Sequence, residues 1–514
     1  MKTIRKLTYL ALGLLALACF ALAPMVRAVT PRPDHAGGNN TAETTGALFS
    51  LTTADGCEEL SFTPPQYFPT GGSSLNVVVA DFNGDGAQDF AVNNDTNVVV
   101  YFGDGRGGFG AAETLSLGGY HQGIATGDFN GDGKPDLAVT NYYEQSVSIL
   151  LNDGSGGFSA PVNFSTGAIA DKVAIGDFNN DDKLDLAILT GGNPVTILLG
   201  NGAGRFGGPS SYPAPKGPID LTLADFNNDG ALDVAISTYA SMKVKILLGD
   251  GQGHLTGGNA YSLDGNSFAI ESGDFNDDGN VDLAVSVSNI YPNDHVAIFI
   301  GDGSGAFTLA QKVYVPDVTG LATADFNGDG KLDFAAATYG FSVVSVALGD
   351  GSGHFGAAQD VLVAHPRQSV FDVATGDFNG DGKADLVTAD YGSRSRGAAV
   401  LLNLPSVKIV AADATASEPG TDTGKFRVTR TGCTDEPLLV YYTVGGTATP
   451  WRDYVALAGQ VVIPEGKVGT TIDVFPLDDH TQEPPETVTV TLAADPAYHV
   501  AGQDSATITI KDND

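Results

Sequence analysis

Short apolar runs alternate with Gly-, Asn- and Pro-rich turns along most of the chain, from residue 61 to residue 403. In the third unit of this pattern, apolar or β-branched runs at 173–176, 184–189 and 195–199 precede a polar, Pro-rich run that opens at Phe206. Such runs bounded by turn residues indicate β-strands, whereas helices would place apolar residues three and four positions apart. The pattern therefore predicts repeated antiparallel units, each with four short strands.

One nonapeptide, Asp-Phe-Asn-x-Asp-Gly-x-x-Asp, recurs every 47 to 52 residues, between the first and second runs of each unit. Its seven copies begin at Asp81, Asp128, Asp177, Asp225, Asp274, Asp325 and Asp377. A period of this length suits a four-stranded supersecondary unit. Because one such sheet cannot bury both of its faces, the units must stack, and radial stacking around an axis gives a β-propeller.

The two ends of the repeat complement each other. After the seventh nonapeptide the chain has an apolar run at 398–403 but no fourth strand, whereas an orphan run, 62–69, precedes the first copy. This orphan run is similar to the fourth run of other units, such as 158–164. We therefore expect one blade to be built from both ends, which closes a seven-bladed propeller over residues 59–404.

The period ends after Pro405, and residues 405–514 show a different alternation. Seven short strands are expected there, at 407–410, 424–430, 438–444, 461–463, 470–474, 487–492 and 506–510. This number of strands in a segment of this length favours an immunoglobulin-like β-sandwich. The predicted fold class is thus all-β: a seven-bladed β-propeller followed by a C-terminal immunoglobulin-like β-sandwich.

The N-terminal segment resembles a targeting signal. Basic residues at the start precede an apolar run at 7–23, and Val26-Arg27-Ala28 offers small residues at the −3 and −1 positions of a cleavage site. These features predict a secretory signal peptide over residues 1–28, with a single membrane anchor as the alternative interpretation. Residues 29–58 mix Pro, Gly, Asn and Thr and are expected to form a flexible leader. The mature chain should be secreted or displayed at the cell surface, without a membrane span.

The charge balance limits the possible partners. The chain has 514 residues, a formal net charge of −35 and 42% hydrophobic residues, so it can fold around a core despite its charge. Such a surface repels nucleic acid and anionic headgroups, whereas a divalent cation would relieve its repulsion. Two cysteines remain after the signal segment, Cys57 and Cys433; a single bridge is conceivable, but two inert thiols are favoured.

The nonapeptide has the chemistry of a calcium loop. Asp at positions 1, 5 and 9, Asn at position 3 and a carbonyl at position 7 offer only oxygen ligands, which suits Ca²⁺ better than the stricter Mg²⁺. The alternative is an ordinary Asx-rich turn. One copy has Asp182 instead of Gly at position 6, where a left-handed backbone is wanted. The candidate ligands are Asp81, Asn83, Asp85, Asp89, Asp128, Asn130, Asp132, Asp136, Asp177, Asn179, Asp181, Asp185, Asp225, Asn227, Asp229, Asp233, Asp274, Asn276, Asp278, Asp282, Asp325, Asn327, Asp329, Asp333, Asp377, Asn379, Asp381 and Asp385.

These nonapeptides resemble the FG-GAP or VCBS repeats of integrin α-subunit heads and related extracellular propellers. The resemblance implies calcium loops on the hairpin between the first and second strands of each blade, and a partner bound on an exposed face. Integrin heads carry such loops in only some blades, whereas every unit has one here.

The tail is similar to a Calx-β domain in the stretches 416–420, 446–454, 463–466, 478–486 and 512–514. The resemblance implies a calcium cluster at one end of the sandwich. Its expected ligands are Glu418, Asp453, Asp478, Asp479, Glu483, Asp512 and Asp514. The alternative interpretation is that these acids belong to solvated turns.

No catalytic pattern accompanies these repeats: the eight histidines are scattered, without a zinc-protease spacing or a nucleophile elbow. We therefore expect no enzyme, but a secreted calcium-binding adhesion or protein-interaction scaffold with an extracellular protein or glycan as its partner. The alternatives are a carbohydrate-binding, lectin-like propeller or the non-catalytic part of a polysaccharide-acting system. Tyrosines near strand ends could stack on sugars, although packing is their commoner role: Tyr120, Tyr142, Tyr143, Tyr239, Tyr291, Tyr339 and Tyr391.

Overall fold

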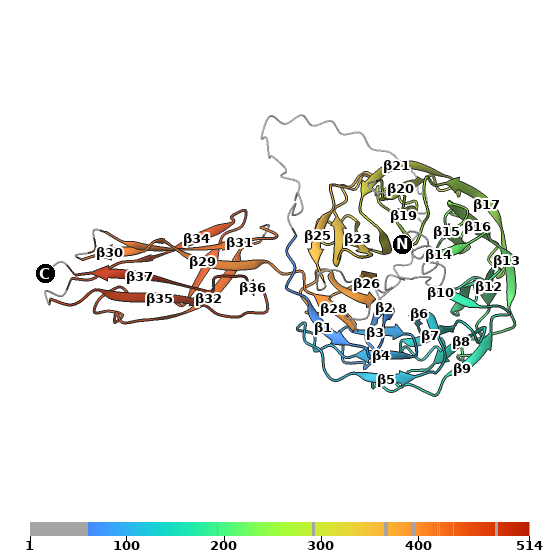
Figure 1. Ribbon diagram of the computed structural model, residues 1–514, viewed down its shortest axis with the longest axis horizontal. Helices are drawn as coiled ribbons and strands as arrows, with labels where there is room; N and C mark the ends of the chain where they lie inside the picture. The colour runs from blue at the N-terminus through green and yellow to red at the C-terminus, as the bar shows by residue number, and fades with distance from the viewer. Residues whose placement is uncertain are drawn as a thin grey trace, which may run out of the picture.

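The computed structural model describes residues 60–192, 194–289, 293–363, 369–391, 397–418, 420, 422–434, 436–478 and 482–512. These residues form an all-β structure with seven four-stranded sheets in a ring, followed by a sandwich of two sheets (Figure 1). Within the described ranges, no helix has the length and apolar character of a membrane-spanning segment. The predicted signal segment 1–28 and leader 29–58 lie outside the described residues.

Each propeller sheet is an antiparallel meander whose strands follow one another outward from the axis. The first six sheets contain β2 (Ser74–Ala80), β3 (Asp89–Asn94), β4 (Asn97–Tyr101) and β5 (Glu113–Ser116); β6 (His121–Gly127), β7 (Asp136–Asn141), β8 (Ser146–Leu150) and β9 (Val162–Ser165); β10 (Ala170–Gly176), β11 (Asp185–Thr190), β12 (Pro194–Leu198) and β13 (Ser210–Pro213); β14 (Pro218–Ala224), β15 (Asp233–Thr238), β16 (Lys243–Gly249) and β17 (Leu255–Ser262); β18 (Ile270–Gly273), β19 (Asp282–Val287), β20 (His295–Gly301) and β21 (Phe307–Tyr314); and β22 (Val318–Ala324), β23 (Asp333–Thr338), β24 (Val343–Ala347) and β25 (Gln359–Leu362).

The seventh blade joins the two ends of the repeat, as the sequence predicts. It consists of β26 (Ser369–Gly376), β27 (Asp385–Tyr391), β28 (Gly397–Leu401) and the N-terminal β1 (Gln66–Pro69). β1 pairs antiparallel with β28, with Tyr67 opposite Ala399, and lies beside it in Figure 1. Hydrogen bonds across the closure remove the exposed edges that a linear array would leave.

Apolar packing between blades also runs around the whole ring. The second strands are buried along their whole length because neighbouring sheets cover both faces. Val77 and Val92 of the first blade share one core cluster with Phe378 and Val387 of the seventh. The first and last copies therefore pack directly on each other, which completes a closed wheel.

A buried lysine lies among carboxyl groups on the innermost strands. Lys172 is fully buried on β10, and its Nζ lies 3.1 Å from Asn76 Oδ1 on β2 and 4.0 Å from Asp220 Oδ1 on β14. Glu271 and Asp372, from two further blades, are also buried and interact electrostatically with this amine. Burial lowers the pKa of Lys172 to about 8, against the opposing effect of these acids. The amine therefore links five blades near the axis.

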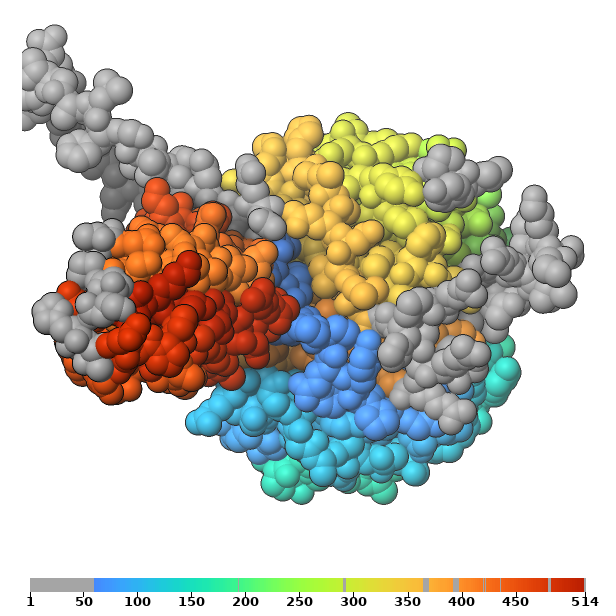
Figure 2. All heavy atoms as spheres, turned by 60° about the vertical axis from the view of Figure 1, so that its left-hand side comes forward, coloured from blue at the N-terminus to red at the C-terminus, as the bar shows by residue number. Residues whose placement is uncertain are grey.

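The C-terminal domain lies against the propeller (Figure 2) and contains the seven strands expected from its sequence and two short additional ones. One sheet has the order β34 (Gly469–Val474), β31 (Gly424–Arg430), β29 (Ser406–Asp413) and β36 (His499–Val500); the other has β30 (Thr415–Ser417), β37 (Ser505–Lys511), β35 (Glu486–Leu492), β32 (Leu438–Gly446) and β33 (Gln460–Ile463). Alternate residues such as Phe426, Val428, Val488 and Val490 point into one core between the sheets. β30 and β36 were missed because strands of two or three residues have no detectable period.

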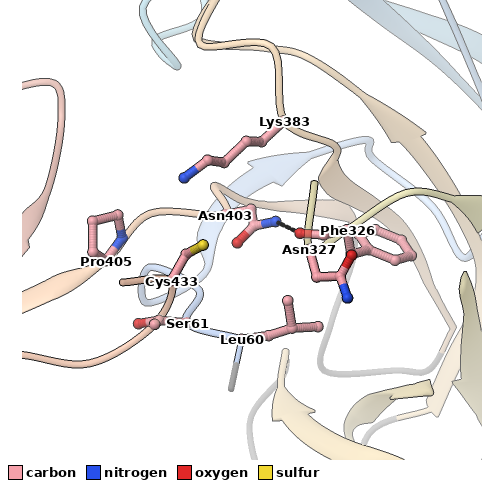
Figure 3. Close-up of a pocket in the computed structure, with 9 residues that line it drawn as sticks. Leu60, Ser61, Phe326, Asn327, Lys383, Asn403, Pro405 and Cys433 are labelled. Atoms are coloured by element: carbon pink, nitrogen blue, oxygen red, sulfur yellow. Dashed lines mark hydrogen bonds between the residues drawn. The ribbon is translucent and has the colours of Figure 1, made fainter. Parts of the chain in front are cut away.

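The expectation of two inert thiols is wrong, because Cys433 forms a disulfide. Its partner lies outside the described residues. Cys433 lines a small pocket where the two domains meet (Figure 3), together with Leu60, Phe326 and Lys383. Since the two bonded sulfurs are far apart in sequence, periodicity offered no signal for this bridge.

We predict that Lys172→Met destabilises the propeller by roughly 3–5 kcal/mol, because the buried carboxyl groups around the axis lose their only cationic neighbour among the described residues. Urea unfolding at neutral pH and constant calcium measures the change. Lys243→Met, at an exposed position on β16, is the matched control. Equal unfolding midpoints for the two variants would contradict a bracing role for Lys172.

Candidate metal centre

The seven nonapeptides form tight turns between the innermost and second strands of every blade. In the first turn, Asp81 Oδ1 accepts hydrogen bonds from the N–H groups of Gly84 at 2.7 Å and Asp85 at 3.2 Å, and its Oδ2 accepts one from Gly86 at 2.8 Å. Asn83 Oδ1 accepts the N–H of Asp85 at 2.9 Å. The short polar side chains thus fold the turn around their own oxygens, as Asx turns do.

Position 6 requires a left-handed backbone in these turns. Gly86 has φ 88°, and Asp182, which replaces glycine in the third copy, has φ 61°. The sequence-based expectation of left-handed geometry at Asp182 is confirmed. An aspartate tolerates this conformation at some energetic cost, so the third turn is the most strained of the seven at this position.

The ninth residue joins the turn to the third strand of the same blade. Asp89 is fully buried; its Oδ2 accepts the N–H of Phe82 at 2.8 Å and its Oδ1 accepts the N–H of Gly103 at 2.7 Å. Every copy repeats this pair of bonds, through Asp136, Asp185, Asp233, Asp282, Asp333 and Asp385. The carboxylate therefore holds together the acidic turn, the start of the second strand and the end of the third strand.

Burial raises the pKa of all seven ninth-position carboxyls. The pKa reaches about 7 in Asp89, Asp333 and Asp385 and about 6 in Asp136, Asp185, Asp233 and Asp282. Desolvation is the main cause; the backbone N–H bonds oppose it, and the acids at positions 1 and 5 add repulsion. A cation beside these groups would remove the repulsion that the fold itself imposes.

The donor set of each turn fits Ca²⁺. It offers carboxylate, amide and carbonyl oxygens, the ligands of a hard cation. Within the described residues, however, the three aspartates of a turn do not bring their oxygens within 4.8 Å of one another, as a ready cluster would. Their oxygens point instead at backbone N–H groups of the turn. Coordination would need further oxygens from the asparagine and the backbone.

Each turn also contacts the next blade. The carbonyl oxygen of the phenylalanine at position 2 accepts a hydrogen bond from the segment that follows the third strand of the neighbouring blade. The seven pairs are Asn152 to Phe82, Gly204 to Phe129, Gly253 to Phe178, Gly305 to Phe226, Gly353 to Phe275, Asn403 to Phe326 and Gly107 to Phe378. Figure 3 shows the bond from Asn403 to Phe326. The candidate metal turns are therefore part of the contacts between blades.

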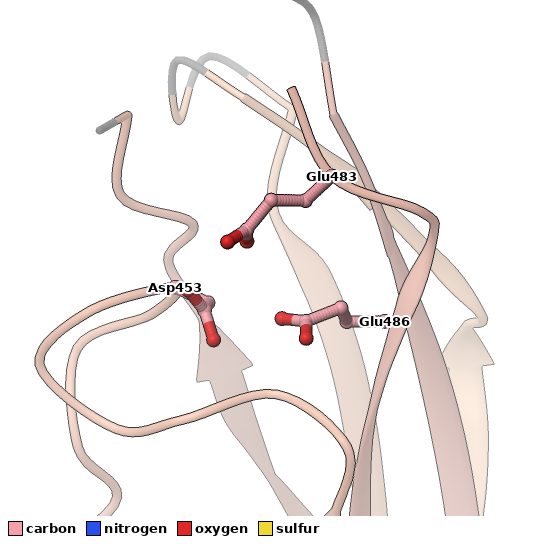
Figure 4. A group of neighbouring side chains, drawn as sticks. All are labelled: Asp453, Glu483 and Glu486. Atoms are coloured by element: carbon pink, nitrogen blue, oxygen red, sulfur yellow. The ribbon is translucent and has the colours of Figure 1, made fainter. Parts of the chain in front are cut away.

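A second acidic site lies at one end of the sandwich. Asp453, Glu483 and Glu486 bring carboxylate oxygens within 4.8 Å of one another and point toward one another in Figure 4. Asp453 is buried and accepts the N–H of Thr449 at 2.6 Å. Burial, together with Asp453, raises the pKa of Glu486 to about 7. Arg452 forms an ion pair with Glu483, so one cation already balances part of this charge.

Three of the other ligands expected at this end of the sandwich lie near the cluster, and two lie outside the described residues. Asp512 accepts the N–H of Glu483, and the N–H of Glu418 bonds to the carbonyl of Lys511 at 3.1 Å, so both lie near the cluster. Asp478 follows Leu477, whose N–H bonds to the carbonyl of Asp453. Asp479 and Asp514 lie outside the described residues. Glu486 was not among the predicted ligands, although its position at the start of β35 beside the other acids was a usable signal.

Both parts of the chain are similar to known families of domains. A family model described as an FG-GAP-like repeat matches residues 81–139, 128–188, 177–236, 225–285, 274–336 and 325–388, and each match spans two successive acidic turns. A Calx-beta domain model matches residues 404–514. A search of curated proteins found no match.

Three solved structures are similar to parts of the chain. BBS1N, solved in complex with ARL6DN and soaked with mercury, is 11% identical with a TM-score of 0.49, over 66% of this chain and 97% of that chain. The apo form of the Calx CBD1 domain is 23% identical with a TM-score of 0.19, over 22% of this chain and 99% of that chain. A protein from Lactobacillus plantarum is 14% identical with a TM-score of 0.42, over 54% of this chain and 83% of that chain.

We predict that Asp282→Asn destabilises the propeller by about 1–3 kcal/mol even without calcium, because an amide oxygen cannot accept both buried N–H groups. Thermal unfolding in chelator measures this effect. Asp302→Asn is the control, since Asp302 lies in the same blade but caps an exposed turn. If both variants unfold at the same temperature, the ninth-position carboxylate does not hold the blade together.

For the sandwich we predict that Glu486→Gln weakens calcium binding by roughly tenfold, since it removes one of three converging carboxyl groups. Isothermal titration calorimetry of the full chain with calcium measures this effect, because only the ions that bind at the sandwich should bind more weakly in the variant. Glu465→Gln, at an exposed turn of the same domain, is the control. An unchanged isotherm for Glu486→Gln would exclude this residue as a ligand.

Proposed function

Because the chain belongs to the FG-GAP-like repeat family and ends in a Calx-beta domain, we propose that it is an exported, calcium-stabilised scaffold for protein or glycan interaction. The proposal includes no catalytic step. The observation that carries it is the repetition, in all seven blades, of one buried carboxylate that fixes an oxygen-rich turn to its own sheet.

Charge supports a role for calcium in stability. The chain has 61 acidic and 26 basic residues, and three aspartates in each of seven turns account for 21 of the acids. Ions held in these turns would offset much of the excess negative charge. Because each turn also bonds to the next blade, ion binding would stiffen the contacts between blades as well as the turns.

The same arrangement favours display over catalysis. The carboxylates of the turns accept backbone N–H groups, and acids committed to such bonds and to a cation are poor proton donors. A rigid ring leaves its exposed faces free to present loops to a partner. The family's repeated architecture is well suited to such extended surfaces.

Two features support export. The N-terminal residues have the pattern of a secretory signal, and Cys433 forms a disulfide, a bond that persists mainly in oxidising compartments. Extracellular fluids also supply calcium at concentrations that weak modules require, with dissociation constants of about 10⁻⁴ to 10⁻³ M. Location and metal supply are therefore consistent with each other.

We predict that calcium raises the melting temperature of the mature chain, since each ion that binds only the folded state at 100 times its dissociation constant adds about 2.7 kcal/mol. Differential scanning calorimetry with calcium, with equal magnesium and with chelator measures the shift. Calcium should stabilise most, because magnesium fits flexible oxygen turns poorly. Superimposable curves in calcium and in chelator would refute the proposal that calcium stabilises the scaffold.

A further inference from the structure

Tyrosine occupies one repeated position on the face of the propeller opposite the acidic turns. Fourteen residues after the first aspartate of each turn, the seven blades have Asp95, Tyr142, Gly191, Tyr239, Ser288, Tyr339 and Tyr391. The second strand begins at the acidic turn and ends at this position, so these residues lie at the other end of the sheet. We call Tyr142, Tyr239, Tyr339 and Tyr391 the tyrosine ring. Tyr291, also singled out in the sequence, lies outside the described residues.

Backbone bonds hold this position beside the axis. The N–H groups of Tyr142, Tyr239 and Tyr339 donate to the carbonyls of Tyr120, Gly217 and Asp317 at 2.8, 2.8 and 2.9 Å. Those carbonyls lie immediately before the innermost strands β6, β14 and β22. The positions of these three tyrosines are therefore set by the innermost strand of the blade and do not depend on a long loop.

Further aromatic residues join three members of the tyrosine ring, Tyr142, Tyr339 and Tyr391, into a patch, whereas Tyr239 packs on Phe268 in another part of the propeller. The ring centroids of Tyr142 and Tyr143 are 4.9 Å apart, and those of Tyr120 and Tyr143 are 5.8 Å apart. Tyr120, Tyr339 and Tyr391 pack against the buried Leu75 and Phe371. The patch thus extends from the second blade across the first and seventh to the sixth. Tyr143 is 68% exposed, so it presents a ring to solvent at one end of the patch.

Carboxylates lie among these rings. Asp95 interacts electrostatically with both Tyr120 and Tyr391, and burial together with Asp95 raises the pKa of Tyr120 to about 12. The Glu144 side chain, next to Tyr143 in sequence, lies over Gly119, where an added Cβ would come within 2.8 Å of Oε1. The patch therefore combines aromatic faces, phenol hydroxyls and carboxyl groups.

We propose that this patch is a binding site for a neutral saccharide. The apolar C–H face of a sugar ring stacks on an aromatic ring, while its hydroxyls donate to carboxylates and exchange hydrogen bonds with phenols. Cores of protein interfaces are depleted in Asp and Glu, so carboxylates placed among the rings favour a sugar over a protein segment. The same carboxylates repel uronic acids, sialic acids and sulfated sugars. The inference deepens the proposed interaction role by naming the partner class and the face.

The test is a glycan array of neutral, acidic and sulfated sugars probed with the mature chain in calcium, followed by titration calorimetry with the best binder. Neutral glycans should lead. Tyr143→Ala should weaken binding by about tenfold or more, because truncating an exposed stacking aromatic removes a dominant contact. Tyr143→Phe, which keeps the ring, should lose less affinity than Tyr143→Ala.

Tyr314→Ala is the matched control, since Tyr314 is 49% exposed on the outer strand β21, away from the patch. Binding of no glycan, preference for acidic glycans, or equal affinity of the Tyr143 and Tyr314 variants would overturn the proposal. A protein bound at the patch in place of a sugar would overturn it as well. Melting curves of the same samples report the calcium-dependent stability separately, so failure of the sugar site and failure of the calcium proposal are distinguishable.

Discussion

A single buried carboxylate, repeated seven times, ties the propeller together. The ninth residue of each acidic turn accepts one N–H from the turn and one from the end of the third strand, so in the first blade Asp89 links Phe82 to Gly103. The phenylalanine whose N–H it accepts also bonds, through its carbonyl, to the next blade. The conformation of the turn is therefore coupled to the sheet behind it and to its neighbour in the ring.

This arrangement concentrates negative charge where solvent cannot screen it. Seven ninth-position acids are buried, and three further buried carboxyl groups, those of Asp220, Glu271 and Asp372, lie around Lys172 near the axis. Desolvation raises the pKa values of these groups, which means that their ionised forms are costly in the absence of a cation. Near the axis the amine of Lys172 offsets part of this cost, and in the acidic turns we propose that calcium offsets it. The opposite face carries the tyrosines, so stabilisation and recognition occupy different ends of the same strands.

Most of the architecture could be predicted because it is periodic. The seven copies of the acidic turn predicted the number of blades, their interval predicted four strands in each, and the similarity of 62–69 to other fourth strands predicted the closure seen between β1 and β28. Alternation within 405–514 predicted the seven longer strands of the sandwich. In the acidic turns, the chemistry of position 6 predicted the left-handed backbone of Asp182.

What could not be predicted depends on contacts between distant residues. The disulfide of Cys433, the amine of Lys172 among acids from other blades, and the convergence of Glu486 with Asp453 all arise only after the sheets assemble. The ninth aspartate is a related case: its spacing suggested a metal ligand, whereas the structure adds two backbone bonds that no pattern reveals. The acidic turn can be predicted from the local sequence, whereas the contacts of each carboxylate depend on how the strands pack in the folded chain.

Anomalous diffraction from crystals of the mature chain grown with calcium tests whether the acidic turns bind the metal. We expect a calcium peak inside each of the seven acidic turns, beside the first and ninth aspartates, while the ninth carboxylate still accepts its two buried backbone N–H groups. Calcium peaks confined to the sandwich, with none in the propeller turns, would show that the repeated carboxylates hold only backbone and would contradict this expectation.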